Sequence, residues 1–228
     1  MTLSPRLKKT VDFAGKCGVV ADIGTDHALV PVYLIENGLY RKAYACDIRP
    51  FPLKRAEEYI SSRNLSDKIT AILSDGLKNV PADVDTVIIA GMGGEMIIDI
   101  LSSDIAHSGS LFVLQPMTAI NDLRLFLYSN GYSILDEEIV SEHRNKKLYS
   151  VMKVKRTGEK AVFSELDVLL SPALQLKKTC EKDLYIIKNI SSRLEIIENL
   201  KKSNSPDLEY MKKTESEIKL LERCLNAE

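Results

Sequence analysis

Short apolar runs alternate with amphipathic stretches over the first part of this 228-residue chain. The runs are rich in Val, Ile and Ala, as expected for strands buried on both faces, and they predict strands at 18–22, 43–47, 69–73, 86–90 and 111–114. The amphipathic stretches predict helices at 28–36, 52–63, 95–101 and 120–129. Because strands that alternate with helices form βαβ units, the sequence predicts an α/β fold with a parallel sheet.

The hydrophobic pattern changes after residue 131. Two strand-like runs, 132–140 and 148–154, flank a charged connector at 141–147. They predict an antiparallel hairpin that closes the sheet and brings it to seven strands. This ending differs from the usual end of a nicotinamide-binding domain.

A second domain is predicted at 159–228, after a first domain at 1–158. Apolar residues recur there at spacings of three and four in two stretches, which predicts an antiparallel helical (coiled-coil) hairpin. Ser205 is expected to cap the second helix, with Pro206 in its first turn. The sequence leaves open whether this hairpin packs, dimerises or binds RNA.

Composition and charge indicate where in the cell the protein works and whether it binds a metal. The formal net charge is −1, so the chain has no bulk basicity. No apolar run reaches the roughly 18 residues of a membrane span, and the N-terminus lacks the apolar core of a signal peptide, so we expect a cytoplasmic protein. The four cysteines lack metal-ligand spacing, which indicates reduced thiols and no metal site.

Three acids, Asp22, Asp47 and Asp75, each follow a short apolar run at or near the end of a predicted strand. In an open α/β sheet, ligands bind outside the carboxyl ends of the parallel strands. Carboxylates at that edge suit a ligand with several donor groups and a positive charge. S-adenosylmethionine (SAM), a sulfonium with an amine, a ribose and an adenine, is such a ligand.

The loop after the first strand reads Asp22-Ile23-Gly24-Thr25-Asp26-His27. Gly24 would let the backbone approach a ligand closely, and Asp22 could accept a hydrogen bond from the SAM amine. Asp26 beside a pyrophosphate would be repulsive, which disfavours a dinucleotide loop.

The other two acids suit the remaining parts of the same ligand. Asp47 could accept hydrogen bonds from both ribose hydroxyls, although its spacing also suits NAD. Asp75 would lie against the adenine amino group, or else form a turn before Gly76.

Two further segments follow the fourth and fifth strands. Three glycines in Ala90-Gly91-Met92-Gly93-Gly94 would permit cofactor and substrate to approach closely over the sheet edge. Gln115 carries a donor and an acceptor, so it could read the edge of a nucleobase or simply bond the backbone of a turn.

Basic residues gather in two places despite the neutral total. Arg144, Lys146 and Lys147 lie in the connector of the terminal hairpin, and Arg6, Lys8 and Lys9 form a smaller group. Either group is a solvated face or part of an RNA surface.

Four segments together resemble the bacterial TrmK family of SAM-dependent tRNA (adenine-N1)-methyltransferases, which act on adenosine 22. They are Leu3-Ser4-Pro5-Arg6-Leu7, Ala21 to His27, Ala90 to Gly94 and Leu114-Gln115-Pro116-Met117. The resemblance implies a class I SAM-dependent methyltransferase fold, with a Rossmann-like seven-stranded sheet and a C-terminal helical hairpin. It also implies that SAM donates a methyl group to N1 of adenine in tRNA.

The expected site follows from the motifs and the resemblance together. Asp26 is the first candidate to stabilise the cationic 1-methyladenine, and His27 would orient Asp26, contact the substrate or serve only structure. With Gln115 these form the expected catalytic group, and Arg144, Lys146 and Lys147 the expected RNA contacts. The expected cofactor-binding residues are Arg6, Asp22, Gly24, Thr25, Asp47, Ile48, Asp75, Gly76, Ala90, Gly91, Met92 and Gly93.

Other classes of function stay open beside this one. The chain could methylate another RNA, a protein or a small molecule, or it could be a noncatalytic SAM-fold binding module. We expect a monomer or weak homodimer that binds tRNA and no membrane.

Overall fold

The computed structural model describes residues 2–103, 106–142, 147–203 and 205–225. The chain divides into two compact units, Met1–Ala161 and Val162–Glu228. The boundary expected from the sequence lies a few residues before this division.

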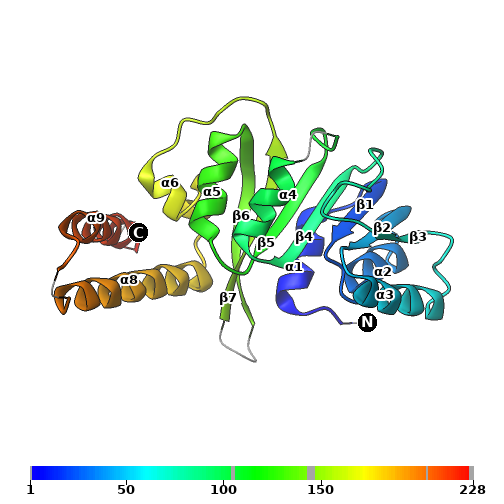
Figure 1. Ribbon diagram of the computed structural model, residues 1–228, viewed down its shortest axis with the longest axis horizontal. Coiled ribbons are helices and arrows are strands. Elements are labelled where there is room, and N and C mark those ends of the chain that lie inside the picture. The colour runs from blue at the N-terminus through cyan, green and yellow to red at the C-terminus, as the bar shows by residue number, and fades with distance from the viewer. Residues whose placement is uncertain (1, 104–105, 143–146, 204, 226–228) are drawn as a thin grey trace. The chain divides into compact units, whose positions relative to one another are not determined.

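One mixed sheet forms the centre of the first unit (Figure 1). In the described residues it has seven strands in the order β3-β2-β1-β4-β5-β7-β6. Strands β1 to β5 pair in parallel, and β7 runs antiparallel to both β5 and β6. The predicted α/β fold with a closing antiparallel hairpin is therefore confirmed. The strands are β1 (Val19–Ile23), β2 (Lys42–Asp47), β3 (Ile69–Leu73), β4 (Thr86–Met92), β5 (Leu111–Pro116), β6 (Tyr132–Glu142) and β7 (Lys147–Arg156).

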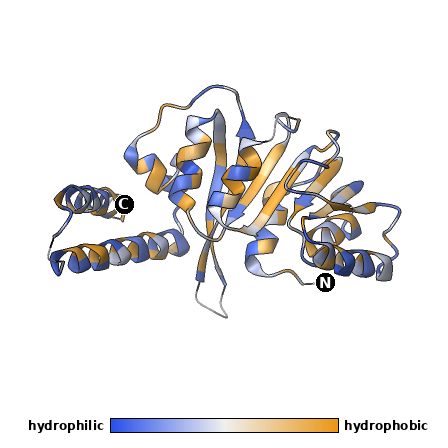
Figure 2. Cartoon of the chain, in the orientation of Figure 1, coloured by the Kyte–Doolittle hydropathy of each residue, from blue (hydrophilic) through white to orange (hydrophobic). Residues whose placement is uncertain are grey.

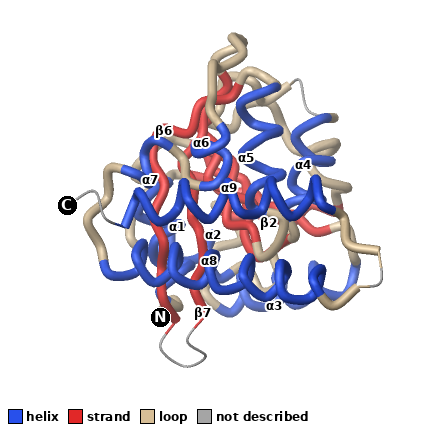
Figure 3. The backbone as a smooth tube through the Cα atoms, turned by 90° about the vertical axis from the view of Figure 1, so that its left-hand side faces the viewer, coloured by secondary structure: helices blue, strands red, loops and turns tan. Residues whose placement is uncertain are grey.

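Helices cover both faces of this sheet, as the tube in Figure 3 shows. In β1, Val19, Ala21 and Ile23 belong to the core beneath α4 and α5, whereas Val20 belongs to the core beneath α1, α2 and α3. This alternation follows from the two-residue period of a strand, and Figure 2 shows that the central strands are largely hydrophobic. The helices are α1 (Pro5–Ala14), α2 (Leu29–Glu36), α3 (Pro50–Ser62), α4 (Gly94–Ser102) and α5 (Ile120–Ser129).

Helix α1 was not predicted from the sequence. It starts with Pro5 in its first turn and buries Val11, Phe13 and Ala14 against the sheet. It contacts β4, β5, β6 and β7, so it brings the N-terminal segment to strands far along the chain.

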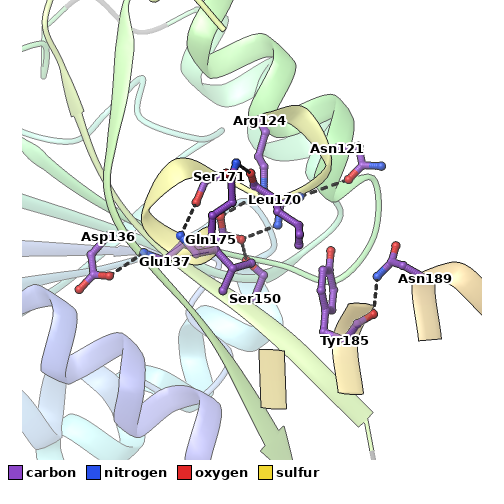
Figure 4. Close-up of polar contacts among 11 residues, drawn as sticks. Asn121, Arg124, Asp136, Glu137, Ser150, Leu170, Ser171, Gln175, Tyr185 and Asn189 are labelled. Atoms are coloured by element: carbon purple, nitrogen blue, oxygen red, sulfur yellow. Dashed lines mark hydrogen bonds and ion pairs between the residues drawn. The ribbon is translucent and has the colours of Figure 1, made fainter. Parts of the chain in front are cut away.

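A buried ion pair ties α5 to the closing hairpin (Figure 4). Both Arg124 and Glu137 have side chains that are 0% exposed, and the guanidinium donates two hydrogen bonds, Nη2 to Oε1 at 2.6 Å and Nε to Oε2 at 3.1 Å. Ser150 Oγ donates a further bond to Glu137 Oε1 at 2.6 Å. The Glu137 carboxylate therefore accepts three hydrogen bonds, which compensate the cost of burying the two charges.

The second unit contains the predicted helical hairpin, preceded by two short helices. Its elements are α6 (Glu165–Leu169), α7 (Pro172–Gln175), α8 (Cys180–Lys201) and α9 (Leu208–Leu225). Helices α8 and α9 pack together, and Arg193 Nε lies 2.7 Å from Glu217 Oε2 between them.

The predicted start of the second hairpin helix was wrong. Helix α9 begins at Leu208, and the side chain of Asp207 accepts the N–H of Tyr210 at 2.9 Å. Asp207 therefore provides the cap expected of Ser205, and Pro206 precedes the helix. Among the helices of the described residues, none is long and apolar enough to cross a membrane.

Candidate cofactor and active site

A cavity of about 1010 Å³ opens in the first unit where β1, β2, β3 and β4 end. This volume lies at the upper end of small-molecule pockets, which leaves room for a cofactor and part of a substrate. Ten of the expected cofactor residues line it: Arg6, Gly24, Asp47, Ile48, Asp75, Gly76, Ala90, Gly91, Met92 and Gly93.

Two glycines shape the floor of this cavity. Gly24 has φ +77°, and a β-carbon there would lie 2.1 Å from Met92 Cε. Gly91 has φ +82°, another backbone conformation that side chains rarely adopt. The two loops can therefore approach each other and a ligand this closely only with glycine at positions 24 and 91.

Asp47 presents a fixed carboxylate at the end of β2. Its side chain is nearly buried, and Oδ1 accepts the backbone N–H of Arg49 at 2.8 Å. Oδ2 has no partner among the described residues and can accept hydroxyl hydrogen bonds. The next residue, Ile48, is 60% exposed and supplies an apolar wall beside it.

Asp75 and helix α4 form the end of the cavity next to β3. Asp75 pairs with Lys78 three residues on, and its side chain is more than half exposed. Met96, Asp99, Ile100 and Ser103 also line this end, and sequence reasoning missed them. Their spacing of three and four along one helix face was the signal that could have identified them.

Asp22 and Thr25 lie behind the cavity wall rather than on it. Strand β1 continues through Ile23, so Asp22 stands inside the strand and is 7% exposed. Burial raises the pKa of the Asp22 carboxyl to about 6, which an interaction with Thr25 opposes, and the nearby Asp47 adds to the rise.

Asp26 and His27 stand at the open side of the cavity. Asp26 lines it with a side chain that is 68% exposed, and His27 Nε2 lies 3.5 Å from Asp26 Oδ2. His27 therefore lies beside Asp26, as expected if it orients that carboxylate, and both side chains are accessible to a large substrate.

Gln115 is fully buried and does not line the cavity. Its Oε1 accepts a hydrogen bond from Arg6 Nη1 at 2.8 Å, and its Nε2 donates to the carbonyl of Pro116 at 2.9 Å. Of these two residues, only Arg6 reaches the cavity.

The basic residues expected to bind RNA are only partly described. Arg144 and Lys146 lie outside the described residues, and Lys147 is exposed at the start of β7. The second basic group is paired with acids: Arg6 with Glu142, Lys8 with Asp12, and Lys9 with Glu138. Each of these three cations therefore has an acidic side chain beside it.

The donor set of the cavity fits SAM. Carboxylates lie along the edge from β3 to β1, two glycine loops allow close approach, and Arg6 provides a cation at the β4 end. In the described residues no three His, Cys, Asp or Glu side chains form a group that could hold a metal ion. Fold and site together define a class I SAM-dependent methyltransferase.

Comparisons with known proteins narrow this class. A family model described as a methyltransferase domain matches residues 3–152. The tRNA (adenine(22)-N(1))-methyltransferase of Bacillus subtilis is 27% identical over 223 residues, which are 96% of this chain and 93% of the relative. The chain belongs to the methyltransferase-domain family and, within it, to the TrmK family.

Solved structures of TrmK proteins share the whole architecture. B. subtilis TrmK has a TM-score of 0.88 at 25% identity, with 98% of this chain and 99% of that chain covered. M. capricolum TrmK in complex with S-adenosylhomocysteine (SAH) has a TM-score of 0.84 at 27% identity, with 99% of each chain covered. The similarity therefore extends through the helical hairpin.

Proposed function

We propose that this chain is a SAM-dependent tRNA methyltransferase that methylates N1 of adenosine 22. The observation that carries the proposal is the cavity at the strand ends, lined by Asp47, Asp75 and the two glycine loops. The B. subtilis relative that matches nearly the whole chain is a tRNA (adenine(22)-N(1))-methyltransferase. The cofactor and the class of substrate follow from these two facts together.

The cofactor residues divide the cavity into three parts. Asp75 and Gly76 receive the adenine at the end of β3, and Asp47 receives the ribose hydroxyls at the end of β2. Gly24 and Gly91 leave room for the amino-acid part at β1 and β4. When bound, SAM supplies an electrophilic methyl group.

Adenine N1 is a neutral nucleophile with an in-plane lone pair, so the reaction requires placement more than proton removal. The product base is cationic. Asp26, at the open side of the cavity, stabilises this developing positive charge, and His27 beside it holds the carboxylate in place. In tRNA the N1 edge is paired or stacked, so the base must first be exposed, which requires a few kcal/mol.

Contacts to the tRNA backbone can offset the free-energy cost of exposing the base. Lys147 is exposed at the start of β7, and Arg144 and Lys146 belong to the same connector in sequence. We assign these three residues to phosphate contacts and the helical hairpin of the second unit to tRNA binding. With tRNA as substrate the protein works in the cytoplasm, as a monomer or weak homodimer.

Methylation of unmodified tRNA tests the proposed reaction. We expect radiolabel transfer from SAM to tRNA and 1-methyladenosine at position 22 by nucleoside mass spectrometry. A tRNA with guanosine at position 22 is the control and should accept no label. SAM binding without transfer to any tRNA would instead favour a binding module, and label only in another RNA, a protein or a small molecule would refute the assigned substrate.

The salt dependence of tRNA binding tests the basic connector. Neutralising Arg144, Lys146 and Lys147 to Gln should weaken tRNA binding and flatten its salt dependence by up to about three phosphate contacts. Lys8→Gln is the control, because Lys8 is paired with Asp12 on α1. An unchanged salt slope in the triple variant would remove the connector from the RNA site.

A further inference from the structure

Arg6 is held by side chains that come more than 100 residues later in the first unit. Its Nη1 donates to Gln115 Oε1 at 2.8 Å, its Nε lies 3.4 Å from Glu142 Oε1, and its Cζ lies 5.8 Å from the centre of the Tyr149 ring. Three strands, β5, β6 and β7, therefore fix one guanidinium that is carried by α1.

Gln115 is the most constrained of these partners. Its side chain is 0% exposed, and its amide N–H donates to the carbonyl of Pro116 at 2.9 Å. This bond fixes which amide atom faces Arg6, since the oxygen is left as the acceptor. Glu142 Oε1, by contrast, is buried but makes no hydrogen bond within the described part of the chain, so it acts on Arg6 through its charge.

These contacts leave one end of the guanidinium available. Among the described residues, no protein group accepts a hydrogen bond from Arg6 Nη2, and Arg6 lines the cavity. Arg6 also lies against the glycine loop, since a β-carbon on Gly91 would be 3.7 Å from Nη1. Two N–H donors of a permanent cation can therefore face a ligand at the β4 end.

The strand order identifies the part of the ligand at that end. Along the sheet edge the strands run β3, β2, β1, β4 and β5, so Asp75 and Arg6 stand at opposite ends of the cavity. With adenine at Asp75 and ribose at Asp47, the amino-acid part of SAM reaches Gly91 and Arg6. Its carboxylate is the one anionic group of that molecule.

We propose that Gln115 is a positioning residue, which aims Arg6 at the carboxylate of the SAM amino-acid part. This inference rests on the proposed function. It also assigns Gln115 a role other than reading the nucleobase, because both ends of its amide are already bonded and its side chain does not reach the cavity.

Two ligands that differ at the amino-acid part separate positioning from packing. SAH carries the carboxylate, whereas 5′-methylthioadenosine has the same adenine and ribose but no amino-acid part. We would measure the Kd of both by isothermal titration for the full chain and for Arg6→Met, Gln115→Met and Lys9→Met. Lys9 is a matched control, because it also joins α1 to β6, through Glu138 at 2.8 Å, and its side chain is 25% exposed like that of Arg6.

The expected readout is the ratio of the two affinities. Arg6→Met should weaken SAH about ten- to a hundredfold and Gln115→Met about three- to tenfold, since the first removes a charged hydrogen bond and the second only its alignment. Both variants should bind methylthioadenosine as the parent does, and Lys9→Met should change neither ligand. A fall in stability alone would lower both affinities together and leave the ratio unchanged.

Three results would overturn the proposal. An unchanged ratio in Gln115→Met would show that Gln115 does not act on the carboxylate through Arg6. If Gln115→Met had the parent's ratio of affinities but a raised KM for tRNA, Gln115 would act on the tRNA substrate and not on the cofactor. A parent chain that binds neither ligand would refute the proposed function itself, which is distinct from failure of the positioning role alone.

Discussion

Replacing Asp47 with Ala should weaken cofactor binding about ten- to a hundredfold. The Asp47 side chain is 5% exposed and its Oδ1 is fixed by the Arg49 N–H, so the carboxylate is aligned before a ligand arrives. A hydrogen bond to a charged acceptor contributes roughly 1.5–3 kcal/mol, and each 1.4 kcal/mol is about tenfold in Kd. Asp47→Asn retains one carbonyl oxygen without the charge, so it should lose about half of that free energy.

Isothermal titration with SAH measures this effect without turnover. The control is Arg49→Ala, because the Arg49 side chain is 71% exposed and its backbone N–H remains in place. That variant should bind SAH within about threefold of the parent, as expected for an exposed ion pair. An Asp47→Ala protein that is folded by thermal unfolding and binds SAH as tightly as the parent would refute the placement of the ribose at β2.

Three other perturbations test the site and the fold. Asp26→Asn should leave SAH affinity within about threefold but lower kcat for tRNA methylation strongly, and an equal loss of both would make Asp26 a cofactor ligand. Glu137→Gln should lower the free energy of unfolding in urea by about 3–5 kcal/mol because it removes the negative charge that compensates the buried Arg124 guanidinium. Glu36→Gln is the control, because Glu36 pairs with Arg63 at the surface, and it should lower the free energy of unfolding by under about 1 kcal/mol. Similar losses in the two variants would contradict a special contribution of the buried pair to stability. The raised pKa of Asp22, about 6, means that the folded state binds its proton more tightly than the unfolded state. This group therefore destabilises the fold increasingly as pH rises from about 4 to about 6, so Asp22→Asn should gain stability relative to the parent over that interval, and a pH-independent difference would show that the two pKa values are equal.

The fold of the first unit could be predicted largely from local pattern. Buried parallel strands are short and apolar, and the predicted strand at 69–73 and helix at 120–129 coincide with β3 and α5. Helix α1 could not be predicted in the same way. Its apolar residues Val11, Phe13 and Ala14 are buried only because they pack on the sheet, and the local sequence does not show that contact.

The acids of the site could be predicted because a strand end fixes where the next side chain lies. The prediction placed Asp22 on the cavity wall, but β1 runs one residue further and retains it inside the strand. The pairing of Arg6 with Gln115 had no local signal, since the two residues are 109 positions apart. Long-range contacts of this kind depend on the completed sheet.

That long separation also bears on how the protein is made. Arg6 leaves the ribosome early, but Gln115 and Glu142 follow much later, and closing so long a loop is slow and entropically unfavourable. Until β5, β6 and β7 join the sheet, α1 lacks most of the strands on which its apolar side packs, and Arg6 lacks the side chains that fix it. A nascent or truncated chain therefore cannot hold the cofactor as the finished one does, and cofactor binding stabilises only molecules whose sheet is complete.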